Sequence, residues 1–286
     1  MDKIVSRLAA VPAKSMMTGM DGEIREGGSP KTPLISIRNV SLSYGNFRAL
    51  TDVSVDFYQG ELVGLVGDNG AGKTTLIRII SGIIPPTSGE VYFDGEKITK
   101  FHPKKAIDLG LECIQQTIGL CDNLSVGRNY FLGREPIRRI FGLPFLDKKK
   151  IKEASAKVVH DFGLRDSVDV DDEIALLSGG EKQTFKIARA VTFRNRVIIM
   201  DEPTNHLSVR ERAHVNELAL QLKQQGLLVI YITHDIFQIH RIADRIVILE
   251  NGRKVTDVPR EAMSSEALEG IIRDGAGTPL KGRSAS

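Results

Sequence analysis

One run of eight residues constrains this chain more than any other feature of its sequence. The run is Gly67-Asp68-Asn69-Gly70-Ala71-Gly72-Lys73-Thr74, which has the spacing G-x-x-x-x-G-K-[ST] of a phosphate-binding P-loop. Glycines let the backbone curl so that successive N–H groups point into one concavity and hold phosphate oxygens. Lys73 supplies a positive charge for the β- and γ-phosphates, and the Thr74 hydroxyl is placed to bind Mg²⁺.

The residues on either side of the P-loop supply the context that such a loop needs. An apolar segment, Leu62–Val66, precedes it and predicts a short strand, and Thr75–Ile80 follows with the apolar spacing of a helix. The positive end of that helix would face the phosphates. A flexible glycine-rich turn is the alternative, and the order strand, loop, helix argues against it. The residues expected to contact a nucleoside triphosphate are Gly67, Asp68, Asn69, Gly70, Ala71, Gly72, Lys73, Thr74 and Thr75.

A second apolar run ends in two carboxylates. Val197–Met200 predicts a buried strand, and Asp201 and Glu202 follow it directly. Open α/β sheets bind their ligands at such strand ends. We expect Asp201 to hold Mg²⁺, directly or through water, and Glu202 to polarise the water that attacks the γ-phosphate. Acidic residues that cap a following helix are the alternative, and Pro203 would suit the first turn of that helix.

A third run, Leu177-Ser178-Gly179-Gly180-Glu181-Lys182-Gln183, predicts a helix start that can bind an anion. Ser178 with Glu181 three residues later is a capping box, which by itself would be a structural role. A cap does not need two glycines, whereas a phosphate that approaches bare backbone N–H groups does. With the P-loop upstream, we favour anion binding by Ser178, Gly179, Gly180 and Glu181.

The remaining hydrophobic patterns outline a mixed α/β domain. Alternating residues predict half-buried antiparallel strands at Leu34–Arg38 and Val53–Phe57, and a continuous apolar run predicts a buried parallel strand at Leu228–Ile232. Further strands are expected at Glu90–Gly95 and, as a hairpin around Asn251-Gly252, at Ile246–Leu249 and Lys254–Thr256.

Helical spacing replaces the strand signals from about residue 106 to residue 176, for instance at Ile151, Ala154 and Val158. We therefore expect a helical subdomain inserted into a nucleotide-binding core. The predicted organisation is a disordered extension at 1–33, a nucleotide-binding domain at 34–274 with the helical subdomain at about 106–190, and a disordered tail at 275–286.

Composition narrows the class of protein. The formal net charge of +3 is too small to argue for a nucleic-acid partner, and the two cysteines have no metal-ligand spacing and suggest a reducing compartment. No apolar run reaches the length needed to span a bilayer, and the start of the chain lacks the apolar core of a signal peptide. We expect a cytosolic protein that reaches a membrane only through a partner.

In the order P-loop, Ser178-Gly179-Gly180, Asp201-Glu202 and then His234, the chain resembles the nucleotide-binding subunit of ATP-binding cassette (ABC) transporters over roughly Leu34 to Arg273. The resemblance implies an ATP hydrolase with a P-loop NTPase core of ABC type, an antiparallel β subdomain and an inserted helical subdomain. It also implies ATP and Mg²⁺ as ligands. In that family two copies form a head-to-tail dimer, in which the signature of one contacts the nucleotide on the P-loop of the other.

The resemblance assigns three further roles. Tyr44 is similar to the aromatic residue that stacks on adenine, although a surface tyrosine is the simpler alternative. Gln116 is similar to the glutamine that senses Mg²⁺ and touches the membrane partner, and the adjacent Gln115 is the alternative. His234 is similar to the switch histidine that hydrogen-bonds the γ-phosphate, whereas a lone histidine after a strand would ordinarily be structural.

The chain departs from the common ABC pattern in two places. The signature has Glu181 where glutamine is commonest, a change that retains the cap. Ser208 stands where many cassettes have aspartate, which puts the usual cross-dimer contact of that loop in doubt but not nucleotide binding.

Within the family, the closest likeness is to bacterial monosaccharide importers of the ribose and fructose type. It lies in Gly110-Leu111-Glu112, in Asn129–Glu135 and in Val197–Thr204. This likeness implies transmembrane permease subunits, a periplasmic sugar-binding protein reached through them, and a place at the cytoplasmic face of the inner membrane. The alternatives are an ATPase for another ABC transporter, a soluble ABC ATPase acting on ribosomes or nucleic acid, and a scaffold that binds nucleotide without hydrolysis.

One segment carries excess positive charge. Residues 134–157 contain eight basic residues against three acidic ones. A solvated loop and helix face is the ordinary interpretation. Attraction to anionic lipid headgroups near the permease is the functional alternative.

Overall fold

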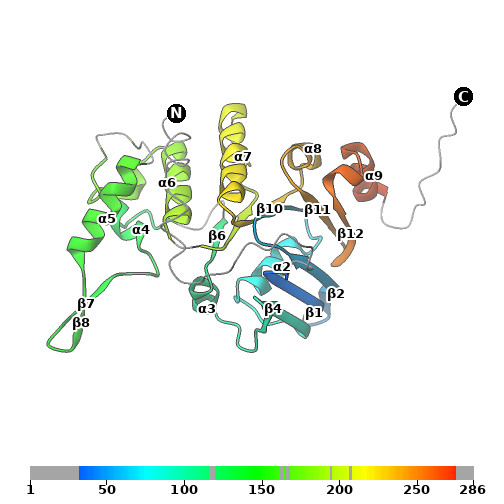
Figure 1. The fold of residues 1–286 in the computed structure, drawn as a ribbon, viewed down its shortest axis with the longest axis horizontal. Helices are drawn as coiled ribbons and strands as arrows, with labels where there is room; N and C mark the ends of the chain where they lie inside the picture. The colour runs from blue at the N-terminus through cyan, green and yellow to red at the C-terminus, as the bar shows by residue number, and fades with distance from the viewer. Residues whose placement is uncertain are drawn as a thin grey trace, which may run out of the picture. The chain divides into compact units, whose positions relative to one another are not determined.

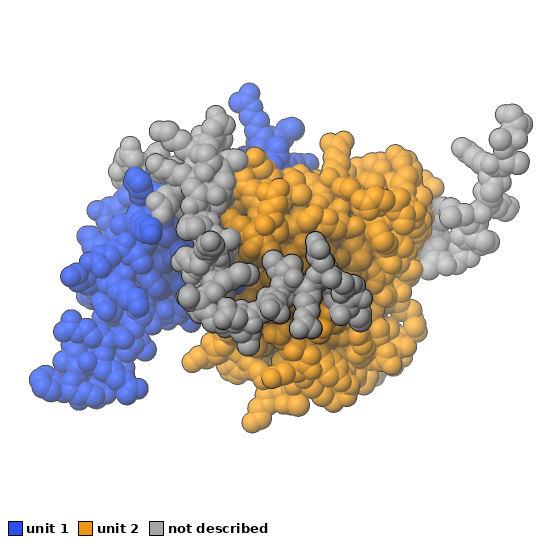
Figure 2. Space-filling model, in the orientation of Figure 1, with its two compact units in different colours: residues 1–24, 114–195, 206–214 blue, residues 25–113, 196–205, 215–286 orange. Residues whose placement is uncertain are grey.

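The structure is a computed structural model that describes residues 32–115, 120–161, 164, 168–193, 195–205 and 208–274 (Figure 1). The described chain divides into two compact units (Figure 2). Unit 1 takes the described residues within 114–195 and 206–214. Unit 2 takes those within 25–113, 196–205 and 215–286. Almost all of the predicted extension, the predicted tail and Gln116 lie outside the described residues.

A six-stranded sheet forms the centre of unit 2, in the order β12-β11-β3-β10-β9-β6. Strands β3 (Leu62–Val66), β9 (Val197–Asp201), β10 (Leu228–Thr233) and β11 (Arg245–Glu250) pair in parallel, and β12 (Arg253–Pro259) pairs antiparallel with β11. Every residue of β3 and β10 is buried. In the sequence such strands are continuous apolar runs, because other parts of the protein cover both of their faces. The predicted strands at 62–66, 197–200 and 228–232 and the predicted hairpin at 246–256 are confirmed.

A second, antiparallel sheet packs in the same unit, in the order β2-β1-β4-β5. Its strands are β1 (Ile35–Tyr44), β2 (Phe47–Phe57), β4 (Ser88–Phe93) and β5 (Glu96–Lys97). The strands predicted at 34–38, 53–57 and 90–95 are confirmed as parts of β1, β2 and β4, although β1 and β2 are longer than predicted and β5 was not predicted. Their inward side chains join one hydrophobic core with those of the parallel sheet and of α2 (Lys73–Ile80), for instance Ile37, Leu65 and Ile79. This shared core fixes the antiparallel sheet against the strand that carries the P-loop.

Shorter helices complete unit 2. They are α3 (Pro103–Asp108), α8 (Ile236–His240), η3 (Arg260–Ala262) and α9 (Ser265–Asp274), and α7 (Val209–Gln224) runs through both sets of residues. Each of α3 and α8 begins with a side chain that accepts a hydrogen bond from the first turn, from Lys104 N–H to His102 and from Gln238 N–H to Asp235.

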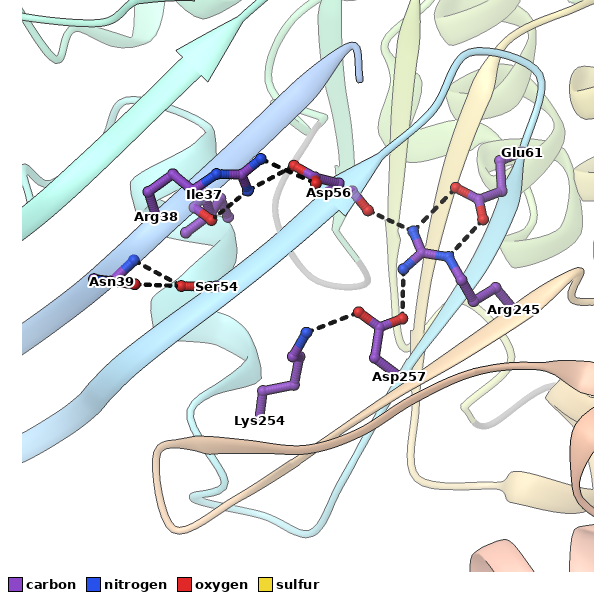
Figure 3. Close-up of polar contacts among 9 residues, drawn as sticks. All are labelled: Ile37, Arg38, Asn39, Ser54, Asp56, Glu61, Arg245, Lys254 and Asp257. Atoms are coloured by element: carbon purple, nitrogen blue, oxygen red, sulfur yellow. Dashed lines mark hydrogen bonds and ion pairs between the residues drawn. The ribbon is translucent and has the colours of Figure 1, made fainter. Parts of the chain in front are cut away.

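A charge network also ties the two sheets of unit 2 together (Figure 3). From β11, the Arg245 guanidinium contacts Glu61 (Nε to Oε1, 2.6 Å), the Asp257 carboxylate on β12 and the backbone carbonyl of Asp56 on β2. Asp56 in turn accepts from both terminal nitrogens of Arg38 on β1, at 2.7 and 3.0 Å. Burial alone would lower the pKa of Arg245, but the hydrogen bonds that Arg245 donates to Glu61 and the charges of Glu61 and Asp257 outweigh it, so the pKa of Arg245 is raised. Arg245 therefore stays charged at the junction of the sheets.

Unit 1 contains α4 (Val126–Tyr130), the hairpin β7 (Ile137–Ile140) and β8 (Leu143–Leu146), α5 (Lys148–Asp161), η2 (Ile174–Leu176) and α6 (Gly179–Thr192). Asn129 is fully buried in it, and its amide receives a hydrogen bond from Cys121 N–H (2.7 Å) and donates to the Cys121 and Leu124 carbonyls (3.0 and 2.9 Å). The rings of Tyr130, Phe131 and Phe193 pack against one another. This cluster joins α4 to the end of α6.

Between residues 106 and 176, where helical spacing was expected to replace the strand signals, the structure has strands in two places. Strand β6 (Leu111–Gln115) is an edge of the main sheet, and Arg196 and Val197 N–H groups both donate to the Gly110 carbonyl beside it. The hairpin β7–β8 is the second exception. Five residues are too few to show a clear period, and the hairpin exposes apolar side chains on both faces, so neither gives the alternation by which strands are found.

No helix in the described part of the chain combines the length and apolar character required to cross a membrane.

The charge network predicts a stability effect. Replacing Arg245 by methionine should lower the free energy of unfolding by about 3–5 kcal/mol, because Glu61 would be left largely buried without its cation. Urea unfolding followed by circular dichroism measures this. The control is Arg260→Met. The ion pair between Arg260 and Glu261 is exposed, so its loss should lower the free energy of unfolding by less than about 1 kcal/mol. Equal losses in the two variants would show that the network has no special role.

Candidate functional site

Three loops meet at the carboxyl edge of the parallel sheet because of the register of its strands. Val66 at the end of β3 lies opposite Thr233 at the end of β10, and Ile232 lies opposite Asp201 on β9. The P-loop, Glu202 and His234 begin directly after these strand ends. Residues more than a hundred positions apart in the chain are therefore neighbours at one edge, the usual location of ligand sites in such sheets.

The P-loop needs glycine where it passes closest to other backbone. Gly67 has φ +151°, and a Cβ added there would lie 2.2 Å from the Leu249 carbonyl oxygen. Gly72 has φ +103°, and its Cβ would lie 2.7 Å from Leu50 Cδ2. A side chain at either position would push the loop away from β11 or β2. Glycine thus holds the loop tight against the sheets, as the spacing predicts.

Helix α2 presents an N-terminus suited to an anion. It begins at Lys73, and the N-cap residue Gly72 offers no side-chain cap. The first turn contains no acidic residue, Thr74 is exposed and Thr75 is half-buried. The first N–H groups of the helix and its dipole therefore favour a negatively charged ligand here.

Lys73 is the buried cation of this site. Its side chain is held by the loop itself, because Nζ donates to the Gly67 carbonyl and to the Asp68 carbonyl (3.0 Å). Burial lowers the pKa of Lys73, and the charges of Glu202, Asp201 and Asp68 act in the opposite direction. The carboxylates across the edge thus help to keep a buried lysine protonated.

A cavity of about 260 Å³ opens beside the P-loop within unit 2. Its wall includes Tyr44 and Phe47, which are backbone partners across the turn between β1 and β2 and are 47% and 65% exposed. The remaining lining residues are Ala49, Asp68, Asn69, Gly70, Ala71, Gly72, Lys73, Thr74, Thr75, Asp201 and Glu202. Sequence reasoning named Tyr44 but missed Phe47, which the turn between two predicted strands could have indicated.

Asp201 and Thr74 supply oxygen ligands of the kind that Mg²⁺ takes from proteins. Burial, followed by the charge of Glu202, raises the pKa of Asp201, while Lys73 and Arg78 oppose the increase. Among the described residues, no group of three or more His, Cys, Asp or Glu side chains is gathered to hold a metal ion. Two protein oxygens fit Mg²⁺, because this ion usually keeps several waters and shares the phosphates of its substrate.

Glu202 is held in an unusual backbone conformation. Its φ is +49°, in the left-handed region that costs a residue with a side chain roughly 1–2 kcal/mol. Its N–H donates to the Ile232 carbonyl (3.0 Å), and its carboxylate accepts from Asn205 Nδ2 (3.0 Å) and contacts His234 Nδ1 (3.0 Å). Sequence reasoning named both Glu202 and His234 but predicted no contact between them, and it missed Asn205.

A partly buried polar network joins two of these loops. Gln238 on α8 donates from Nε2 to Asn216 Oδ1 (2.9 Å) and to the Tyr231 hydroxyl (3.0 Å), and it accepts from Thr204 Oγ1 (3.2 Å). Burial raises the pKa of Tyr231 to about 12, so this hydroxyl remains neutral at any working pH. The network connects the loop that carries Glu202 with the helix that follows His234. No sequence pattern indicated it.

The signature segment belongs to unit 1 and forms the predicted capping box. Ser178 Oγ accepts from Glu181 N–H (3.3 Å), and Ser178 N–H donates to the Glu181 carboxylate (2.8 Å). Gly179 has open space around its Cα, and Gly180 lies in the same first turn. The cap and an accessible helix start are thus both present. Whether this end binds an anion remains a prediction, as does the role of Gln116.

Comparison with known proteins identifies the family of this chain. Residues 50–205, more than half of the chain, match the family described as ABC transporter. The chain belongs to the ABC transporter family. The P-loop, both carboxylates and the signature of this cassette fall within the matched residues. The recognition made from the sequence is therefore confirmed, as are the α/β fold of ABC type and ATP hydrolysis as the activity.

Curated relatives of the cassette agree over most of its length. It is 42% identical to a xylose/arabinose import ATP-binding protein of Sulfolobus acidocaldarius, over 84% of this chain and 93% of that protein. It is 36% identical to a fructose import ATP-binding protein of Rhizobium meliloti, over 82% and 92%. It is 35% identical to a ribose import ATP-binding protein of Escherichia coli O157:H7, over 87% of this chain but 47% of that protein, so the cassette spans about half of this relative.

Solved structures have the same fold. A dimeric ATP-binding cassette in a post-hydrolysis state, bound to ADP and phosphate, superposes with a TM-score of 0.66 at 25% identity over 79% of this chain and 98% of that one. The ADP conformation of another ABC transporter cassette superposes with a TM-score of 0.69 at 24% identity, over 85% and 96%. The second similarity supports the fold alone.

The pKa of Asp201 gives a pH-dependent prediction. Since its pKa is raised in the folded cassette, ionisation of Asp201 lowers stability as the pH rises from its ordinary pKa through the raised value. Asp201→Asn should therefore melt at a higher temperature than the parent chain at pH 7, and the difference should vanish in acid. Differential scanning fluorimetry without nucleotide measures this. The exposed Asp108→Asn is the control, and a lower melting temperature for Asp201→Asn at pH 7 would contradict the assignment.

The polar network predicts a linked loss of stability and turnover. Gln238→Leu leaves the Tyr231 hydroxyl and Thr204 short of partners, which should cost about 1–3 kcal/mol of unfolding free energy. Because the loops of Glu202 and His234 lose their connection, kcat for ATP should fall several-fold while KM changes little. Steady-state hydrolysis assays measure both constants, with the exposed Gln224→Leu as control. An unchanged kcat in a destabilised variant would limit the network to a structural role.

Proposed function

We propose that this chain is the ATP-hydrolysing subunit of a membrane importer for a monosaccharide or a related polyol. The observation that carries the proposal is the meeting of Lys73, Asp201, Glu202 and His234 at one strand edge, in a chain 42% identical to a sugar import ATP-binding protein over nearly all of that protein. A cassette that only bound nucleotide would not need the carboxylate and histidine in contact with each other.

The P-loop and its surroundings bind ATP in this proposal. Backbone N–H groups from Gly67 to Thr75 and the Lys73 ammonium hold the phosphates, and Tyr44, with Phe47 beside it, receives the adenine. Thr74, Asp201 and Gln116 would hold Mg²⁺, which when bound supplies positive charge to the phosphate oxygens.

Glu202 acts on the attacking water. Its carboxylate is fixed from two sides, by Asn205 and by His234, so it can accept a proton or a hydrogen bond in a defined direction. His234 is 57% exposed and can exchange its contact with Glu202 for one with the γ-phosphate. The geometry thus supports hydrolysis by positioning and electrostatics, which is how phosphoryl transfer is generally catalysed.

A second copy of the chain completes the site. The exposed start of α6 offers the N–H groups of Gly179 and Gly180 and the Ser178 hydroxyl to the γ-phosphate held by the other copy, while the Glu181 N–H closes the capping box. Support comes from the dimeric cassette that this chain resembles in structure. Ser208 caps α7 through Glu211 (N–H to Oε2, 2.8 Å), so it has a local role here.

The names of the relatives support the remaining partners. Import implies transmembrane permease subunits and, through them, a periplasmic sugar-binding protein. The cassette then sits peripherally at the cytoplasmic face of the inner membrane. The weak net charge fits this setting and gives no reason to invoke a nucleic acid.

Glu202→Gln tests the catalytic assignment. Loss of the general base should slow ATP turnover by roughly two to four orders of magnitude while ATP binding persists. With ATP and Mg²⁺ the variant should then accumulate as a dimer on size exclusion, and adding Ser178→Arg should abolish that dimer but not binding to the monomer. Glu217→Gln, an exposed change on α7, is the matched control. Normal turnover in Glu202→Gln would remove the carboxylate from the mechanism.

Assembly with the permease tests import itself. We expect a permease gene beside the gene of this chain, and the two co-expressed products should form a complex. Hydrolysis by this complex in proteoliposomes should increase with a pentose or hexose and its binding protein. Glu202→Gln should eliminate both hydrolysis and uptake. Hydrolysis that no sugar stimulates, in a complex that does assemble, would favour a different solute.

A further inference from the structure

The β7–β8 hairpin in unit 1 exposes apolar side chains that soluble proteins normally bury. Phe141 at its tip is fully exposed, and Ile137 and Leu143 are 64% and 62% exposed. Phe145 and Leu146 are exposed as well. In Figure 1 the hairpin projects from α4 and α5. Contiguous exposed apolar residues of this kind mark a surface that meets a partner or a membrane.

The apolar side chains of the hairpin are divided between its two faces, and so are its arginines. In its register Ile137 pairs with Leu146 and Ile140 with Leu143, and these two pairs lie on opposite faces because they are three positions apart. Arg138 and Arg139 likewise lie on opposite faces. A protein surface that docked on one face would leave the other in water. A lipid interface surrounds both faces and also accepts arginines, whose charged ends reach the headgroups.

The hairpin continues into a basic helix start. Lys148, Lys149 and Lys150 begin α5, whose first turn has no acidic residue. Three lysines at the positive end of a helix are unfavourable for the helix itself. Lysine is also depleted in protein–protein interfaces, whereas clustered lysine and arginine are typical of surfaces that bind anionic lipids. Lys148, Lys150, Arg138 and Arg139 have no ion-pair partner among the residues that the structure describes.

A groove of about 370 Å³ lies where the hairpin joins α5, also within unit 1. Arg128, Lys148 and Lys152 line it together with the apolar Leu146 and Ile151. Lys152 is paired with Asp171 (2.6 Å), and Arg128 and Lys148 remain available. Asp171 also lines the groove, where Lys152 balances its charge. The two remaining cations beside apolar side chains suit a phosphate group attached to an acyl chain.

We infer that the β7–β8 hairpin and this groove form a docking surface for an anionic phospholipid bilayer, with Phe141 inserted among the headgroups and the basic residues on the lipid phosphates. The inference does not depend on the proposed function, since vesicles without any permease test it. It adds a direct membrane contact to a chain whose described helices cannot cross a bilayer.

Vesicle binding tests the charge. The full chain should co-sediment with phosphatidylcholine vesicles that contain phosphatidylglycerol, less so with phosphatidylcholine alone, and progressively less as salt increases. Replacing Lys148, Lys149 and Lys150 by glutamine should weaken binding about a hundredfold at low salt, since each residue near the surface contributes about fivefold. The matched control replaces Lys100, Lys104 and Lys105, three exposed lysines of unit 2, by glutamine.

Fluorescence tests the insertion. The sequence contains no tryptophan, so Phe141→Trp introduces a single reporter at the tip. Its emission should shift to shorter wavelength with anionic vesicles and be quenched by brominated acyl chains. Ile83→Trp, at a half-exposed apolar position of unit 2, is the control and should show neither effect. ATP binding and circular dichroism should be unchanged in all variants, which excludes misfolding.

The possible results separate the bilayer from other occupants. Anionic-specific binding lost in the lysine variant but not in its control, with a shift at residue 141 only, supports the inference. Absence of vesicle binding by the parent chain, or equal binding by both lysine variants, overturns it. If hairpin variants keep vesicle binding but no longer co-purify with the permease, the surface docks protein and the inference is wrong.

Discussion

The hydrogen-bond register of three parallel strands is the constraint on which the rest of this cassette depends. Because β3, β10 and β9 align Val66, Thr233 and Asp201 at one edge, the loops that follow them must share a small volume. The strands are buried on both faces, so a shift of register would break the core as well as the site. The same packed strands therefore stabilise the fold and position the loops of the site.

The second sheet of unit 2 matters to the site in another way. It contributes Tyr44 and Phe47 to the wall of the cavity, while its core residues pack against the strand that precedes the P-loop. The Arg245 network fixes the edge of this sheet to β11 and β12 (Figure 3). The aromatic wall and the phosphate loop therefore keep a constant separation, as a ligand that contacts both requires.

Patterns local in sequence predicted much of the fold and most of the site. The P-loop, the buried strand before Asp201 and the cap of α6 each depend on residues close together in the chain, so their physics is visible in the sequence. Gln238 contacts residues 22 and 34 positions away, so its contacts leave no periodic signal in the sequence. Asn205 is only three residues from Glu202, but their contact depends on the conformation of the loop, which no motif indicated. The β7–β8 hairpin was missed for the opposite reason, because nothing in the described chain covers it and it shows no buried face.

The left-handed backbone of Glu202 has a consequence for how this protein can change. Glycine adopts φ near +49° without penalty, so exchanging Glu202 for glycine would relieve local strain while it deleted the carboxylate. The same exchange would remove the contacts of the carboxylate with Asn205 and His234, so part of the relief would be offset. The strained conformation therefore persists because the surrounding contacts hold a carboxylate at this point of the strand edge.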